Sequence, residues 1–155
     1  MDASPKISCT LFQTGQHNLV LPNSAIAEVL VTTDLATTEN KPTWNAGEIR
    51  WDRRKIQVVS LDHLASPIKE SKKTEYIILV IRNPIPNSPP AYFGIVASAI
   101  PQIVLANSST IHKNLQPTNL HEYSMSYVLL NGRPAMIPDI GRIANLIKKS
   151  RISKQ

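Results

Sequence analysis

The chain has 155 residues, which is enough for one domain with a continuous hydrophobic core. Hydrophobic residues make up 42% of it and charged residues 18%, a composition that excludes an intrinsically disordered chain. The single cysteine, Cys9, excludes an internal disulfide and a multi-cysteine metal site, and it predicts a reducing, cytoplasmic compartment. The longest apolar run, 76–81, is far too short to span a bilayer, so no direct membrane insertion is expected.

The net charge of +6 is unevenly distributed along the chain. Residues 1–75 are electrically balanced, whereas residues 76–155 carry eight basic side chains and only two acidic ones, Glu122 and Asp139. Four of these basic residues lie within 148–154. Such a basic end suits the C-terminus of a solvated helix, and contact with nucleic acid or an acidic partner is the alternative.

Short apolar runs separated by turn residues predict strands in the first half of the chain. These predicted strands are 7–12, 17–21, 46–51 and 55–61. Between them, 24–31 fits either a kinked strand or a short helical turn, because its apolar alternation is imperfect. The charged residues 52–54 predict a tight hairpin turn, whereas 61–64 suggests the start of a helical turn and 66–73 a polar linker.

The second half continues the pattern of short strands. Its predicted strands are 76–81, 92–100, 102–106, 127–130 and 134–137. Four prolines in 83–90 predict a surface loop, and the polar stretch 107–124 is expected to be mostly loop. Asn131-Gly132 between two apolar runs favours a type I′ hairpin, because both central residues need positive φ.

One helix is predicted, from Pro138 to residue 149, with Pro138 at its first position and Asp139 in its first turn. Four apolar residues follow helical spacing on one face: Ile140, Ile143, Ala144 and Ile147. Many short strands followed by an amphipathic helix indicate a mostly β barrel or sandwich onto which the helix docks.

The sequence offers no pattern typical of catalysis. Its five glycines are too scattered for a phosphate-binding loop, and no cofactor is expected. His112 and His121 lack a third ligand at zinc spacing. Ser60, Asp62 and His63 lie too close together in sequence to assume a hydrolase triad, and no nucleophile elbow is present. We therefore expect a protein that is not an enzyme and has no metal site.

Two tryptophans flank Gly47 and are candidates for either the core or a partner surface. For Trp51 the core is favoured, whereas for Trp44 the two interpretations stay open. Four basic residues surround the predicted hairpin tip: Arg50, Arg53, Arg54 and Lys55. Since Glu48 and Asp52 partly neutralise them, the tip suggests an exposed turn available to a protein partner rather than a nucleic-acid patch.

The order of these elements resembles the CheW-like family of chemotaxis adaptors over residues 7–147. Ile26, Glu28 and Val29 match the family's Val-x-Glu-Val, and Gly94 and Val96 match its Gly-x-Val. The apolar skeleton of a longer family motif is kept by Gly47, Ile49, Trp51, Ile56, Val58, Val59 and Leu61. The resemblance is strongest to divergent members in type IV pilus chemosensory clusters, such as the ChpC group.

The resemblance implies two small five-stranded β-barrels around a shared core, with a C-terminal helix and no catalysis. The implied division is a first barrel at 7–65, a second barrel at 74–137, the helix at 138–149 and a basic tail at 150–155. In this family one face of the first barrel binds the regulatory domain of a histidine kinase. The groove between the barrels accepts the tip of a chemoreceptor. Both interactions are between proteins and are largely apolar. The resemblance also implies a chemosensory pathway that can control twitching motility.

The sequence departs from the family most clearly at the hairpin tip, where Asp52 stands in place of arginine and Arg53 in place of glycine. Further replacements put Gln57 where the family has proline, and Ser60 and Ala97 where it has aspartate. These departures predict a dedicated partner in place of the ordinary kinase and receptor. The expected partner-binding residues are Ile26, Glu28, Val29, Trp44, Asp52, Arg53 and Arg54.

A small basic β-barrel that binds nucleic acid is the alternative function from another class. Its basic residues would line one barrel face, whereas here the excess lies at the C-terminal end, which favours the adaptor.

Overall fold

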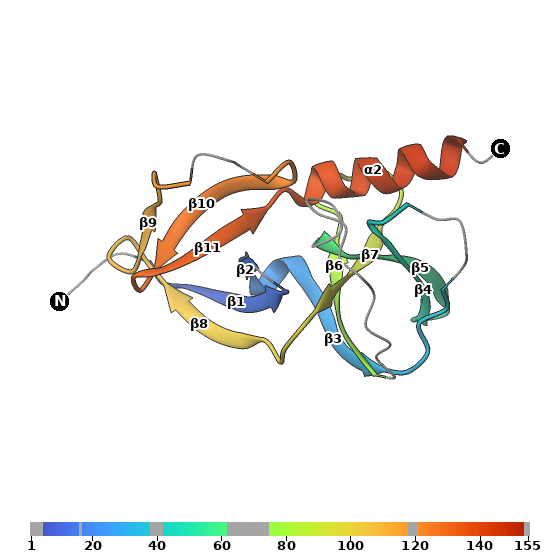
Figure 1. Cartoon of the computed structure of the whole chain (residues 1–155), viewed down its shortest axis with the longest axis horizontal. Helices are drawn as coiled ribbons and strands as arrows, with labels where there is room; N and C mark the ends of the chain where they lie inside the picture. Colours follow the sequence, from blue (N-terminus) through green and yellow to red (C-terminus); the bar gives the residue numbers. More distant parts are fainter. Residues whose placement is uncertain (1–4, 16, 38–41, 62–74, 118–120, 154–155) are drawn as a thin grey trace.

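The computed structural model describes residues 5–15, 17–37, 42–61, 75–117 and 121–153. Within these ranges the chain forms eleven strands, a short 3₁₀ helix and the C-terminal helix α2. The strands lie in two sheets side by side along the long axis of the molecule, as Figure 1 shows. The predicted mostly β fold with a C-terminal helix is confirmed. No helix among the described residues is long and apolar enough to cross a membrane.

The six-stranded sheet combines two strands from the start of the chain with four strands from its second half. Its order is β8-β1-β2-β11-β10-β9. These strands are β1 (Ile7–Thr14), β2 (His17–Pro22), β8 (Gln102–Ala106), β9 (Ile111–Lys113), β10 (Ser124–Leu130) and β11 (Arg133–Pro138). Neighbouring strands are antiparallel except β2 and β11, which pair in parallel where Leu19 meets Met136.

The five-stranded sheet is built from the middle of the chain in the order β3-β6-β7-β5-β4. Its strands are β3 (Ile26–Thr32), β4 (Asn45–Trp51), β5 (Arg54–Val59), β6 (Tyr76–Arg82) and β7 (Tyr92–Ala97). A bridge between Ala36, just after β3, and Glu48 on β4 brings the two edges of this sheet together. The sheet therefore curls toward a barrel, in which β6, formed by the predicted strand 76–81, lies between β3 and β7.

The predicted division of the chain between the two barrels is wrong. The hairpin of β1 and β2 belongs with the C-terminal strands, not with the other strands of 7–65. The expected strands 92–100 and 102–106, both assigned to the second barrel, are likewise divided, because β7 and β8 lie in different sheets. The reason is that β1 hydrogen-bonds to β8 and β2 to β11. Pairing between strands so far apart in the chain leaves no local signal in the sequence. The first sheet has six strands rather than five because β9 forms within the expected loop 107–124.

Two hairpins use left-handed residues at both central positions. The predicted type I′ turn is confirmed, with φ of 51° at Asn131 and 78° at Gly132. Asp52 and Arg53 adopt the same left-handed region, with φ of 48° and 62°, although neither is a glycine. The residues at 24–31 combine both alternatives, since the 3₁₀ helix η1 (Asn23–Ala25) leads into β3, which is bulged. The expected helical turn after Leu61 and linker 66–73 lie outside the described residues.

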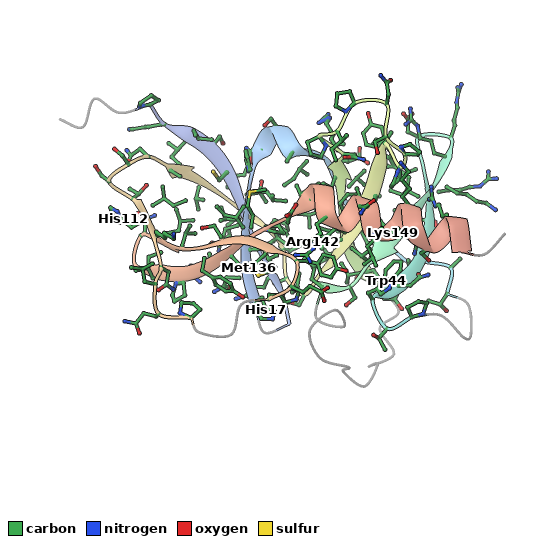
Figure 2. All side chains as sticks on the ribbon, turned by 90° about the horizontal axis from the view of Figure 1, so that it is seen from above. His17, Trp44, His112, Met136, Arg142 and Lys149 are labelled. Carbon is green, nitrogen blue, oxygen red and sulfur yellow. The ribbon has the colours of Figure 1, made fainter. Side chains whose placement is uncertain are left out.

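Helix α2 (Ile140–Ser153) packs its apolar face onto the core that the two sheets share. The four predicted helix residues, Ile140, Ile143, Ala144 and Ile147, are all buried. They belong to one cluster with side chains from both sheets, including Phe12, Leu19, Met136, Leu79, Ile81, Phe93 and Ile95. Figure 2 shows α2 crossing in front of the sheets, with Arg142 and Lys149 on it. The helix therefore packs against both sheets.

Both predicted ends of the helix need correction. Pro138 is the last residue of β11 and not the first of the helix. Asp139 instead caps α2, because its Oδ1 accepts a hydrogen bond of 3.1 Å from the backbone N–H of Arg142. At the other end α2 continues to Ser153, so 150–153 belong to the helix and not to a separate tail. No glycine or proline follows residue 149 to stop the helix earlier.

Candidate protein-binding surface

Strand β3 carries an exposed apolar surface at the edge of the five-stranded sheet. Val29 and Val31 are 43% and 55% exposed. They pair with Leu79 and Ile77 of β6, so all four side chains lie on one face of the sheet. Leu79 is fully buried in the shared core, and Ile77 packs against that core. On β6 this face of the sheet is buried in the core. On β3 the same face is exposed to solvent, and it is apolar at Val29 and Val31.

Four side chains from different strands meet beside this edge. The indole N–H of Trp51 on β4 donates a hydrogen bond of 3.0 Å to Oε2 of Glu28 on β3. The ring of Tyr92 on β7 lies 4.9 Å from that of Trp51, centroid to centroid. The guanidinium of Arg54 on β5 lies 4.8 Å above the Tyr92 ring, which is cation–π geometry. Aromatic rings therefore connect the predicted residues Glu28 and Arg54.

The hairpin turn places Asp52 and Arg53 at an exposed tip next to this cluster. Together with Arg54 they present one acidic and two basic groups. Because the backbone of both turn residues is left-handed, the tip is a tight two-residue turn. Since neighbouring residues of a strand point to opposite faces, Glu28 lies on the other face of β3 from Val29 and Val31. We call the residues around this edge strand, on both of its faces and at the hairpin tip, the β3 surface: Glu28, Val29, Val31, Trp51, Asp52, Arg53, Arg54 and Tyr92.

The two remaining predicted residues lie inward from the β3 surface. Trp44 is only 9% exposed and belongs to the shared core, which resolves the open choice between core and partner surface. Ile26 is half-buried at the margin of the same core, and its carbonyl accepts a hydrogen bond of 3.4 Å from Arg82. Trp51, for which the core was favoured, is half-buried and packs against a second buried cluster that includes Ile49 and Ile56. Its indole N–H nevertheless reaches the carboxylate of Glu28 at the surface.

Sequence reasoning missed Val31 and Tyr92 on this surface. The spacing of Val29 and Val31 was available as a signal, because residues two apart in a strand share a face. Nothing in the sequence distinguishes Tyr92 from a core aromatic. A second exposed apolar strip was also missed, on and around β8, where four large side chains are exposed: Ile7, Ile100, Ile103 and Leu105.

The histidines that were considered as metal ligands do not form a metal site together. His112 lies on β9, whereas His121 is buried and its ring is used structurally. Its Nδ1 accepts a hydrogen bond of 3.0 Å from the backbone N–H of Tyr123, and its Nε2 lies 3.2 Å from the carbonyl oxygen of Leu61. No group of three His, Cys, Asp or Glu side chains within the described ranges could hold a metal ion.

Two partly buried side chains, Cys9 and Tyr123, have a raised pKa. Burial raises the pKa of the Cys9 thiol. Burial also raises the pKa of Tyr123, the charge of Glu122 raises it further, and the nearby Arg142 guanidinium lowers it. A cavity of about 490 Å³ lies under the proline-rich loop, between Arg82 and Tyr92.

A five-stranded sheet that curls toward a barrel and a six-stranded sheet share one core, onto which a C-terminal helix packs, and together they define a two-sheet β domain. Residues 8–148 match the family model for the CheW-like domain, and the chain belongs to this family. The fold is similar to the crystal structure of the scaffolding protein TtCheW from Thermoanaerobacter tengcongensis. That match has a TM-score of 0.68 and 14% sequence identity, and it covers 89% of this chain and 88% of the other. No curated protein matches the sequence.

Proposed function

We propose that the protein is a non-catalytic adaptor of a chemosensory system and that its β3 surface binds a histidine kinase regulatory domain or a chemoreceptor. Membership of the CheW-like family supports the class, and the structurally similar TtCheW is described as a scaffolding protein. The observation that carries the proposal is the exposure of Val29 and Val31 on a sheet face that is otherwise core. Apolar groups placed in this way are typical anchors of protein interfaces.

The charged residues of the β3 surface set which partner is accepted. Asp52 places a negative charge where the family usually has a positive one, next to Arg53 and Arg54. Like charges across an interface cost up to several kcal/mol, whereas complementary charges speed association. The protein therefore prefers a dedicated partner that carries a cation opposite Asp52. A pathway that controls type IV pilus motility, as in the ChpC group, is the setting that we propose for it.

The apolar part of the proposal is tested with purified kinase regulatory domain and receptor hairpin from the native host. Val29→Lys with Val31→Lys is expected to weaken binding at least about tenfold, since interface anchors dominate affinity. The matched control is Leu115→Lys with Met125→Lys, which changes two exposed apolar residues elsewhere. Titration calorimetry measures both. Equal affinity of the two variants for the bound partner would contradict the proposal, as would failure of the unchanged protein to bind either one.

The charged part has its own test. Asp52→Arg with Arg53→Gly is expected to raise affinity for a standard chemoreceptor tip and to lower it for the dedicated partner. The comparison is made at low and at physiological salt, because exposed charge pairs weaken as ionic strength rises. Unchanged binding to both partners would show that Asp52 is an ordinary solvated turn residue.

A further inference from the structure

Strand β8 forms an open edge of the six-stranded sheet. Its residues pair with β1 on one side, with Val104 opposite Cys9 and Ile103 opposite Thr10. Among the described residues no strand pairs with its other side. An open edge presents a row of backbone N–H and C=O groups and can accept another strand. Figure 1 shows β8 along the lower side of the molecule, away from α2.

The sequence around β8 lacks the charges that usually protect such an edge. Residues 98–111 include no Asp, Glu, Lys or Arg, although 18% of the chain is charged. Pro101 stands just before the strand and blocks pairing only at that end. On one face of β8, Ile103 is 74% and Leu105 is 57% exposed. The strand is therefore uncharged, and its exposed apolar side chains lie between Pro101 at one end and the buried Ala106 at the other.

We propose that two copies of this chain associate through antiparallel pairing of their β8 strands. With Val104 on the two-fold axis, Ile103 lies opposite Leu105 of the partner subunit, and Leu105 lies opposite Ile103 of the partner subunit. Directly opposed residues of antiparallel strands share a face, so each exposed side chain gains an apolar neighbour. The two six-stranded sheets become one twelve-stranded sheet. A two-fold interface of this kind needs a self-complementary surface, and the strand provides it.

Charge and size together set the expected strength of this association. Each copy carries a net charge of +6, so the copies repel one another at long range, and salt relieves this repulsion. Two five-residue strands bury less than the roughly 1,200 Å² of a stable complex, so the dimer is weak. We expect a dissociation constant on the order of 100 µM at physiological salt. Association should therefore strengthen as salt increases, the opposite of a charge-driven complex.

Sedimentation velocity from about 5 to about 500 µM tests the pairing on the full chain. A lysine variant (Ile103→Lys with Leu105→Lys) and a glutamate variant (Ile103→Glu with Leu105→Glu) should each stay monomeric, because like charges then face each other across the axis. Mixed together, the two variants should form a heterodimer, because each introduced ammonium then faces a carboxylate. The control, Leu115→Lys with Met125→Lys, should dimerise like the unchanged protein. Circular dichroism confirms that every variant is folded.

Three results would overturn the proposal. The first is an unchanged protein that stays monomeric over the whole concentration range. The second is a dimer that persists in the lysine variant, since it would use another surface. The third is a mixture of the two charged variants that stays monomeric, since the antiparallel register requires the charges to meet. A monomeric protein whose lysine variant loses binding to a receptor hairpin would assign β8 to that partner instead.

Discussion

The indole nitrogen of Trp51 donates its hydrogen bond to the carboxylate of Glu28, and this bond joins the two edge strands of the five-stranded sheet. A backbone bridge between Ala36 and Glu48 closes the same gap farther along, with two hydrogen bonds of 2.9 Å. The hydrogen bond between Trp51 and Glu28 has a second consequence besides joining the two edge strands. It also fixes the position of the carboxylate that we propose as a partner contact, and the ring of Tyr92 packs against the indole.

Removing this bond should loosen the barrel edge. Trp51→Phe keeps an aromatic ring against Tyr92 but loses the N–H donor, and we expect about 1–2 kcal/mol of lost stability. Glu28→Gln keeps an acceptor oxygen and should cost less than half of that. Urea denaturation followed by circular dichroism measures both changes. Identical midpoints for Trp51→Phe and the unchanged protein would show that the bond contributes nothing to folding.

The left-handed turn predicts a stabilising substitution. Arg53 has a φ of 62°, which an L-residue adopts at a cost of roughly 1–2 kcal/mol and glycine adopts freely. Because glycine also loses more entropy on folding, the expected net gain of Arg53→Gly is about 0.5–1 kcal/mol. Arg54→Gly is the matched control, and it should destabilise because residue 54 is the first of β5 and stacks on Tyr92. Thermal unfolding of both variants checks the opposite signs.

Local signals were enough to predict most individual strands and the helix. Asn131-Gly132 determines its turn by backbone sterics alone, and the spacing of Ile140, Ile143 and Ile147 determines which face of α2 is buried. Each depends on residues that are close in sequence. The same reasoning placed Asp139 in the first turn of the helix, whereas Asp139 caps it because β11 extends to Pro138, and it ended the helix at residue 149 instead of Ser153.

The assignment of strands to sheets could not be predicted from such signals. The parallel contact of Leu19 with Met136 joins residues far apart in the chain, and neither residue differs from any other core residue in pattern. The same limit applies to the two tryptophans, because indole burial depends on which strand lies opposite. The resemblance identified Ile26, Glu28 and Val29 as a group. Only the structure shows that Glu28 meets Trp51 while Ile26 is turned toward the core.

Glycine at position 47 is required by the bridge that closes the five-stranded sheet. Its φ is +128°, and a β-carbon there would overlap the carbonyl oxygen of Ala36. Gly47→Ala should therefore cost about 2–4 kcal/mol, through both backbone strain and displacement of the bridge. Gly132→Ala is the control, because its φ is +78° but the space around it is open, so about 1 kcal/mol is expected. Equal losses for the two variants would mean that the close approach to Ala36 is unimportant.

Cys9 should react slowly in the folded protein. It is 7% exposed, and burial raises the pKa of its thiol, so less of the reactive thiolate is present at any pH below that value. At pH 8 an aromatic disulfide reagent should modify the native protein on the order of a hundredfold more slowly than the urea-unfolded chain. Raising the pH should increase the native rate until the raised pKa is passed. Equal native and unfolded rates would place Cys9 at an accessible site.

Helix α2 should be essential for the two sheets to stay together. Its residues Ile143 and Ile147 are 0% and 1% exposed, and they contact core side chains from both sheets. Replacing either isoleucine by alanine removes buried apolar contacts and should cost about 2–5 kcal/mol. The two replacements together approach the 5–15 kcal/mol that is typical of a whole domain. Asn145→Ala and Lys149→Ala, on the exposed face of the same helix, should change stability by less than about 0.5 kcal/mol.

The way in which the double variant, Ile143→Ala with Ile147→Ala, unfolds is as informative as its loss of stability. If α2 holds the sheets together, Ile143→Ala with Ile147→Ala should lose the cooperative transition and bind a hydrophobic dye while keeping its strand signal. The exposed-face control should unfold in one transition, as a single small domain does. A double variant that still melts cooperatively, within a few degrees of the unchanged protein, would show that the sheets pack on one another without help from the helix.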